Sequence, residues 1–240
     1  MTKHKQTHIL LIPLILLLLA LGSSCVVTEQ LTFNASGYNN SKYDFTVEDF
    51  FIAVLEDFSE FAPEEQDISL MDKAIADFDR ALKYSSTTNS VTMHKLTDNA
   101  YRGQFNFMDL DKLFSDLGAG REQSLLKQSN NTLTFFLSMD NYDQLVPVIP
   151  FLADENFEAF GPVYNQGLSE SDYLEMISFM LGEEGPPAIE LSTITLRIAT
   201  PKPIKSFKNG KKVGANLYEF SFPLIDFLLL AEPITFSVSW

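Results

Sequence analysis

The chain contains a single cysteine, Cys25, which stands directly behind a short apolar leader. Lys3 and Lys5 precede an apolar run over residues 9–21, and the small residues 22–24 then lead into the cysteine. This layout is typical of an export signal, and the run is shorter than the roughly 20 apolar residues that cross a membrane. One cysteine allows no disulfide within the chain, so the hydrophobic core alone has to stabilise the fold.

Residues 21–25, of sequence LGSSC, resemble a bacterial lipobox, in which a signal peptidase cuts before an acylated cysteine. Gly22 stands where the usual box has a large apolar residue, and Leu21 lies one position earlier. The resemblance implies that residues 1–24 are a lipoprotein signal peptide and that Cys25 carries acyl chains such as palmitate. Several such chains give stable membrane attachment, because each buried CH₂ contributes ~0.8 kcal/mol. The alternative is an ordinary signal peptide that happens to end near a cysteine.

The charge balance of the chain excludes a class of partners. Lysine and arginine number 17 against 32 acidic residues, for a net charge of −15, and Lys3 and Lys5 leave with the leader. A protein with this excess of negative charge repels nucleic acid and anionic lipid headgroups. Any contact with lipid therefore has to use apolar surface. We expect residues 25–45 to form the lipidated N-terminus and first strand, and residues 46–240 to form a single α+β domain.

Hydrophobic periodicity predicts groups of strands alternating with groups of helices. Strands are expected over 26–33, 91–96, 100–107, 123–127, 132–139, 194–198, 217–222 and 234–240, and helices from Thr46, from Ser69 and over 109–117, 155–160 and 169–181. The polar stretch 34–42 is interpreted as a loop or turn, and the apolar stretch 224–230 is ambiguous between helix and strand. We therefore expect an α+β fold, an antiparallel sheet with several amphipathic helices packed on one face.

The first of these strands departs from strict alternation at one position. Val27, Leu31 and Phe33 lie on one face, and Glu29 interrupts that face.

Residues with catalytic or metal-binding chemistry are sparse. His94 is the only histidine beyond the leader, and it lies on a predicted strand in polar surroundings. Cysteine and histidine are too few for a zinc site. The acid pairs Asp77/Asp79 and Asp109/Asp111 fit solvated helix faces, since residues two apart on a helix point to different sides. We expect no enzyme activity, no cofactor and no metal; a hydrolase that uses two converging carboxylates is the least favoured alternative.

Two apolar features favour a binding role. Phenylalanine occurs 21 times against one tryptophan, which fits either a Phe-rich core or a cavity lined by rings. The apolar segment 145–152 contains two prolines, so it is either a buried irregular connection or the rim of a cavity. The candidate residues for contact with an apolar ligand are Phe50, Phe51, Phe151 and Leu152. The run 225–230 belongs either to the core or to a lipid-facing surface.

The C-terminal part resembles one family of envelope proteins. The features are the run ATPKPI at 199–204, Asn209-Gly210, FSFPL at 220–224 and the closing Trp240. Together with the N-terminal layout they are similar to the mycobacterial LppM type of lipoprotein. In that type a strand after the lipid cysteine is followed by helix and sheet, and a phospholipid-binding role is proposed. The resemblance implies no functional residue.

These observations predict a non-enzymatic envelope lipoprotein that is anchored in the membrane through Cys25 and binds a lipid or another apolar ligand. The alternative is an envelope scaffold or surface module that binds other proteins. Expected partners are the membrane and either a lipid ligand or an envelope protein, but not nucleic acid. Val26 gives no acidic inner-membrane retention signal, which favours the outer membrane in a diderm cell.

Overall fold

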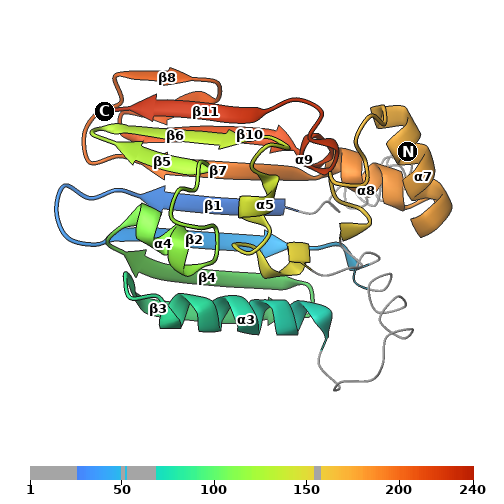
Figure 1. Ribbon diagram of the computed structural model, residues 1–240, viewed down its shortest axis with the longest axis horizontal. Coiled ribbons are helices and arrows are strands. Elements are labelled where there is room, and N and C mark those ends of the chain that lie inside the picture. Colours follow the sequence, from blue (N-terminus) through green and yellow to red (C-terminus); the bar gives the residue numbers. More distant parts are fainter. Residues whose placement is uncertain (1–25, 50–51, 53–68, 154–157) are drawn as a thin grey trace, which may run out of the picture.

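Two mostly antiparallel β-sheets form the framework of the molecule (Figure 1). The computed structural model describes residues 26–49, 52, 69–153 and 158–240. Within this part of the chain, the larger sheet has the strand order β3-β4-β2-β1-β7-β10-β9 and the smaller sheet β5-β6-β11-β8. The strands are β1 (Val26–Thr32), β2 (Asn39–Thr46), β3 (Thr88–Thr97), β4 (Ala100–Phe107), β5 (Leu126–Ser129), β6 (Thr132–Leu137), β7 (Thr193–Ala199), β8 (Ser206–Lys208), β9 (Lys211–Gly214), β10 (Leu217–Pro223) and β11 (Ile234–Ser239).

Strand β1 occupies the middle of the larger sheet. It pairs antiparallel with β2 and parallel with β7, so Val26 lies opposite both Thr46 and Thr193. Parallel neighbours need a long crossover connection, and here the crossover contains most of the chain. The first strand is therefore held on both edges by segments that are distant from each other in the sequence.

The core lies between the two sheets. Phe236 of β11 packs on Tyr218 and Phe220 of β10, with ring centroids 5.4 and 5.2 Å apart. The closing Trp240 stacks on Phe33, just beyond β1, at 5.6 Å. These contacts join the inner faces of two sheets, as in a sandwich whose alternating inward side chains form the core.

The helices pack in three different places (Figure 1). Helix α3 runs along the β3 and β4 side of the larger sheet, whereas α7, α8 and α9 form a group at one end and pack around Tyr173, Ile177 and Ile225. Short helical pieces lie over the middle. The helices are α3 (Leu70–Tyr84), α4 (Leu110–Asp116), α5 (Tyr142–Leu145), the 3₁₀ helix η1 (Pro150–Ala153), α7 (Glu170–Leu181), α8 (Gly185–Leu191) and α9 (Leu224–Leu229).

The predicted α+β class is confirmed, with mixed helices and two mostly antiparallel sheets. The finer expectation that several helices share one face of a single sheet is not confirmed. The ambiguous stretch 224–230 contains helix α9, which ends at Leu230 in the left-handed conformation. Its side chains Ile225 and Leu229 are buried, so this part of the run belongs to the core.

The loop predicted over 34–42 is wrong for its second half, because β2 begins at Asn39 and lies between β1 and β4. Its inward residues are Ser41, Tyr43 and Phe45, but the intervening residues are polar. Asn, Asp and Lys are depleted in strands, which is why the pattern indicates a loop. Tertiary pairing on both edges overrides this local preference. Most of the helix predicted from Thr46 lies outside the described residues.

Candidate apolar ligand cavity

A cavity of about 370 Å³ lies in the core between the two sheets. Its walls come from nearly every part of the fold. The larger sheet contributes Val27, Leu31, Phe45, Phe105, Ile194, Leu196, Ile198 and Phe222; the smaller sheet contributes Leu126, Phe135, Leu137 and Phe236; the helices and their connections contribute Phe78, Leu113, Phe114, Leu117, Leu145, Val148, Ile149, Leu152, Phe160, Ile177, Ala188, Ile189, Leu224, Phe227 and Leu228. Almost all of this surface is apolar, as in ligand sites that bury a hydrocarbon chain.

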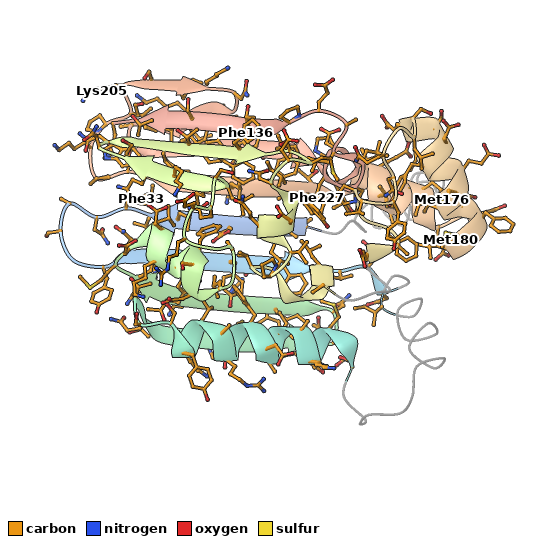
Figure 2. All side chains as sticks on the ribbon, in the orientation of Figure 1. Phe33, Phe136, Met176, Met180, Lys205 and Phe227 are labelled. Atoms are coloured by element: carbon orange, nitrogen blue, oxygen red, sulfur yellow. The ribbon has the colours of Figure 1, made fainter. Side chains whose placement is uncertain are left out.

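Phenylalanine rings account for much of the wall. They come from both sheets and from α3, α4 and α9, and Figure 2 labels one of them, Phe227 of α9. Other rings, such as those of Phe33 and Phe107, are packed in the core and do not line the space. The high phenylalanine content therefore serves both interpretations that the sequence leaves open: part of it fills the core and part of it lines the cavity.

Glu29 is the one ionisable carboxyl on this wall among the described residues. Val27, Glu29 and Leu31 alternate along β1 and all three face the cavity. The Ser41 hydroxyl, which is fully buried, donates a hydrogen bond of 3.0 Å to Glu29 Oε1. Burial raises the pKa of Glu29 because the apolar surroundings disfavour its charged form, and the bond from Ser41 lowers it by a smaller amount. Glu29 is only partly buried, and its side chain is among those that line the cavity.

A second polar group lies next to Glu29 in the sheet. Tyr43 of β2 is the direct partner of Glu29 across the strands, and its hydroxyl donates to Met93 Sδ at 2.6 Å. Burial, together with the nearby carboxyls of Glu29 and Asp79, raises the pKa of Tyr43 above its usual range. Tyr43 therefore stays neutral and adds no negative charge beside Glu29.

Gly103 of β4 allows the Tyr43 ring to occupy this position. A Cβ added at Gly103 would lie 2.1 Å from the ring, so only glycine leaves enough room. The ring of Phe78 on α3 also packs on Tyr43, with ring centroids 5.8 Å apart. Contacts with Gly103 and Phe78 thus hold Tyr43 in place beside Glu29.

Of the predicted ligand residues, Leu152 is buried and lines the cavity. Phe151 belongs to η1, and its side chain is outside the described part, as are Phe50, Phe51 and Cys25. The segment 145–152 contributes several wall residues, so it is both a buried irregular connection and part of the cavity wall. Sequence reasoning missed Glu29 as a site residue; its signal was the interruption of an apolar strand face.

The residues considered for catalysis do not line the cavity. His94 is exposed on β3. Asp77 binds Arg80 and Asp79 binds Lys83, both within α3, while Asp109 caps α4. Within the described ranges, no three Cys, His, Asp or Glu side chains gather as metal ligands would.

Another hollow lies against β10, α9 and β11, with Asp226, Glu232 and Asn209 among its walls. It offers far less apolar surface than the cavity between the sheets. We therefore regard the inner cavity as the candidate site.

Comparisons with known proteins show a distant structural similarity. No family model matches the chain, and no curated protein matches it. Among solved structures, the folded domain of the Mycobacterium tuberculosis LppM protein, determined by NMR, aligns over 90% of this chain and 89% of that one, with 11% identity and a TM-score of 0.39. At this score we base the functional argument on the cavity alone. None of the helices in the described residues has the length and apolar character of a membrane span.

Proposed function

We propose that this chain is an envelope lipoprotein, anchored through Cys25, whose folded part binds a lipid or another amphipathic ligand without acting as an enzyme. One observation carries the binding role: the cavity of about 370 Å³ with an almost wholly apolar wall. Its volume falls within the range of roughly 300–1,000 Å³ that is typical of small-molecule sites.

The volume is large in energetic terms. Protein interiors are close-packed, and voids larger than a water molecule are few. At roughly 24 cal/mol per Å³, a dry void of this size would cost about 9 kcal/mol. The whole free energy of folding of a domain is about 5–15 kcal/mol. An apolar occupant that restores these contacts would therefore stabilise the fold strongly, which supports a binding role.

The pairing of β1 supports a proposal for the end of the molecule that would face the membrane. Val26, next to the proposed anchor, lies opposite Thr193, which comes shortly after α8. Helix α7 packs on α8 and exposes Phe179, with 92% of its surface accessible, and Met180; Figure 2 labels Met180 and its neighbour Met176 at this end. We propose that this end rests on the membrane, since the acidic protein has to use apolar rather than basic contacts.

The binding proposal is tested by native mass spectrometry of residues 26–240, which contain every described strand and helix. We expect the protein from a bacterial host to carry extra mass that is removed by organic extraction and is identified as lipid in the extract. Protein that was delipidated and then mixed with host lipid should regain the mass. A protein that has only its own mass before and after mixing would refute the binding role and favour the scaffold alternative.

A further inference from the structure

We propose that the cavity prefers an amphipathic ligand that carries an amine, because the Glu29 carboxyl on its wall supplies the acceptor and the counter-charge for that group. This inference rests on the proposed binding role and names the chemical class of the ligand. It predicts an order of affinity among ligands of equal chain length: amine above alcohol, and alcohol above carboxylate.

Glu29 lies in an apolar part of the cavity wall. It lies between Val27 and Leu31 on β1, and its neighbours across the sheet are Tyr43 and Leu196. A carboxyl on a wall of aliphatic and aromatic groups loses its hydration, which is unfavourable unless hydrogen bonds or an opposite charge compensate. A leucine or valine at this position would continue the alternation and avoid that cost, so the carboxyl is best explained by a polar ligand group.

Within the described part of the chain, hydrogen bonds leave one oxygen of Glu29 available. Oε1 accepts from the Ser41 hydroxyl, and no described donor bonds to Oε2. The neighbouring Tyr43 hydroxyl is engaged with Met93 Sδ and does not reach the carboxyl. A carboxylate has capacity for several donors, so Oε2 is free to accept one from a ligand inside the cavity.

No positive side chain on the described wall balances the Glu29 carboxylate. Among the described residues, the wall contains no lysine, arginine or histidine. Asp79, the other acid that acts on Tyr43, forms an ion pair with Lys83 and does not line the cavity. The whole chain is acidic, with a net charge of −15. The lack of a positive side chain on the described wall and the acidity of the chain both favour a cationic group and disfavour a carboxylate or phosphate.

The test measures the binding of dodecylamine, dodecanol and dodecanoate to delipidated residues 26–240 by isothermal titration calorimetry at pH 7, below the concentrations at which these probes form micelles. A hydrogen bond to a charged partner predicts that the amine binds about tenfold or more tightly than the alcohol. The variant Glu29→Gln keeps the shape of the side chain and removes its charge. We expect it to lose that preference while it still binds the alcohol with unchanged affinity.

The control is Glu183→Gln, which makes the same chemical change at an exposed position between α7 and α8. It should retain the preference for the amine, which separates a local effect of Glu29 from the general attraction of an acidic protein. Equal affinity for all three probes, or a preference that survives Glu29→Gln, would overturn this inference and leave the binding role intact. Failure of the neutral alcohol and of both charged probes to bind would overturn the binding role as well.

Discussion

Filling the cavity from one wall should block ligand binding and stabilise the unliganded protein. Ala188 of α8 lines the cavity, and the substitution Ala188→Phe would place a ring in it. A cavity of about 150 Å³ is sufficient to hold benzene. The cavity of about 370 Å³ therefore accepts one ring without overpacking and keeps less than two thirds of its space.

The magnitude follows from this volume. Filling about 150 Å³ at roughly 24 cal/mol per Å³ gives an upper value of about 3.6 kcal/mol. The loss of side-chain freedom and imperfect fit reduce this to about 1–3 kcal/mol. For a domain of this size each kcal/mol raises Tm by roughly 2–4 °C, so Ala188→Phe should melt about 2–12 °C above the delipidated wild type. A ligand present at a hundredfold excess over its Kd should raise the wild-type Tm by about 5–10 °C.

The assay is thermal unfolding of delipidated protein, followed by circular dichroism with and without dodecylamine. We expect Ala188→Phe to show the higher starting Tm and a ligand-induced shift less than half that of the wild type. The control Ala76→Phe adds the same ring at an exposed position of α3, and it should leave both values near those of the wild type. A lower Tm for Ala188→Phe together with a full ligand response would refute the reasoning, because the ring would then have met packed side chains instead of open space.

Three further outcomes are expected. In the ligand-free protein, burial raises the pKa of Glu29, so the folded state keeps a proton that the unfolded chain releases, and stability falls as pH rises through that interval; a bound amine would instead favour the charged carboxylate. Glu29→Gln should therefore raise the Tm of the ligand-free protein more at pH 8 than at pH 4, and an equal gain at both pH values would contradict this. Replacing the exposed Phe179 by serine should weaken the binding of residues 26–240 to phosphatidylcholine vesicles about tenfold in a flotation assay, and unchanged flotation would exclude α7 as the contact. The substitution Ser169→Ala removes the cap of α7 and should lower Tm by about 2–4 °C, since such caps contribute about 1 kcal/mol; an unchanged Tm would show that the end of this helix is not coupled to global unfolding.

Features that depend on a few neighbouring residues could be predicted from the sequence. Ser169 and Asp172 form the capping box that opens α7, because each side chain satisfies the backbone N–H of the other. Asn209 and Gly210 both adopt positive φ in the turn between β8 and β9, which these two residue types tolerate best. In both cases the local energy is decisive and tertiary packing only adds to it.

Features that depend on distant partners could not be predicted in this way. Strand β2 has a polar sequence and forms because β1 and β4 offer backbone partners on both edges. The parallel pairing of β1 with β7 joins residues that are far apart in the chain, and no local pattern specifies it. The sheet order, and with it the cavity, results from these long-range pairings.

The candidate site shows the same division. Leu152 was a candidate because it lies in an apolar segment that contains two prolines. Prolines prevent a regular helix, so the apolar side chains of such a segment cannot all pack into the core as one helical face. Glu29 was visible only as an irregularity in a strand, since nothing in the sequence tells which side chains face it. Only the pairing with β2 and β7 places Ser41, Tyr43 and Leu196 around it.

Strand β1 also links the two proposals. Val26 adjoins the proposed anchor, and Glu29 follows three residues later on the same strand, about 10 Å further along at roughly 3.3 Å per residue. A membrane in contact with the chain at position 25 would therefore lie only about 10 Å from Glu29, measured along this strand. A short path of this kind lets a tethered protein take up a ligand from the bilayer without leaving it, with the apolar chain entering the space between the sheets and the amine meeting Glu29. A long tether between anchor and domain would lose this advantage, so inserting a flexible linker between residues 25 and 26 should slow ligand uptake from vesicles while leaving the affinity for free ligand unchanged.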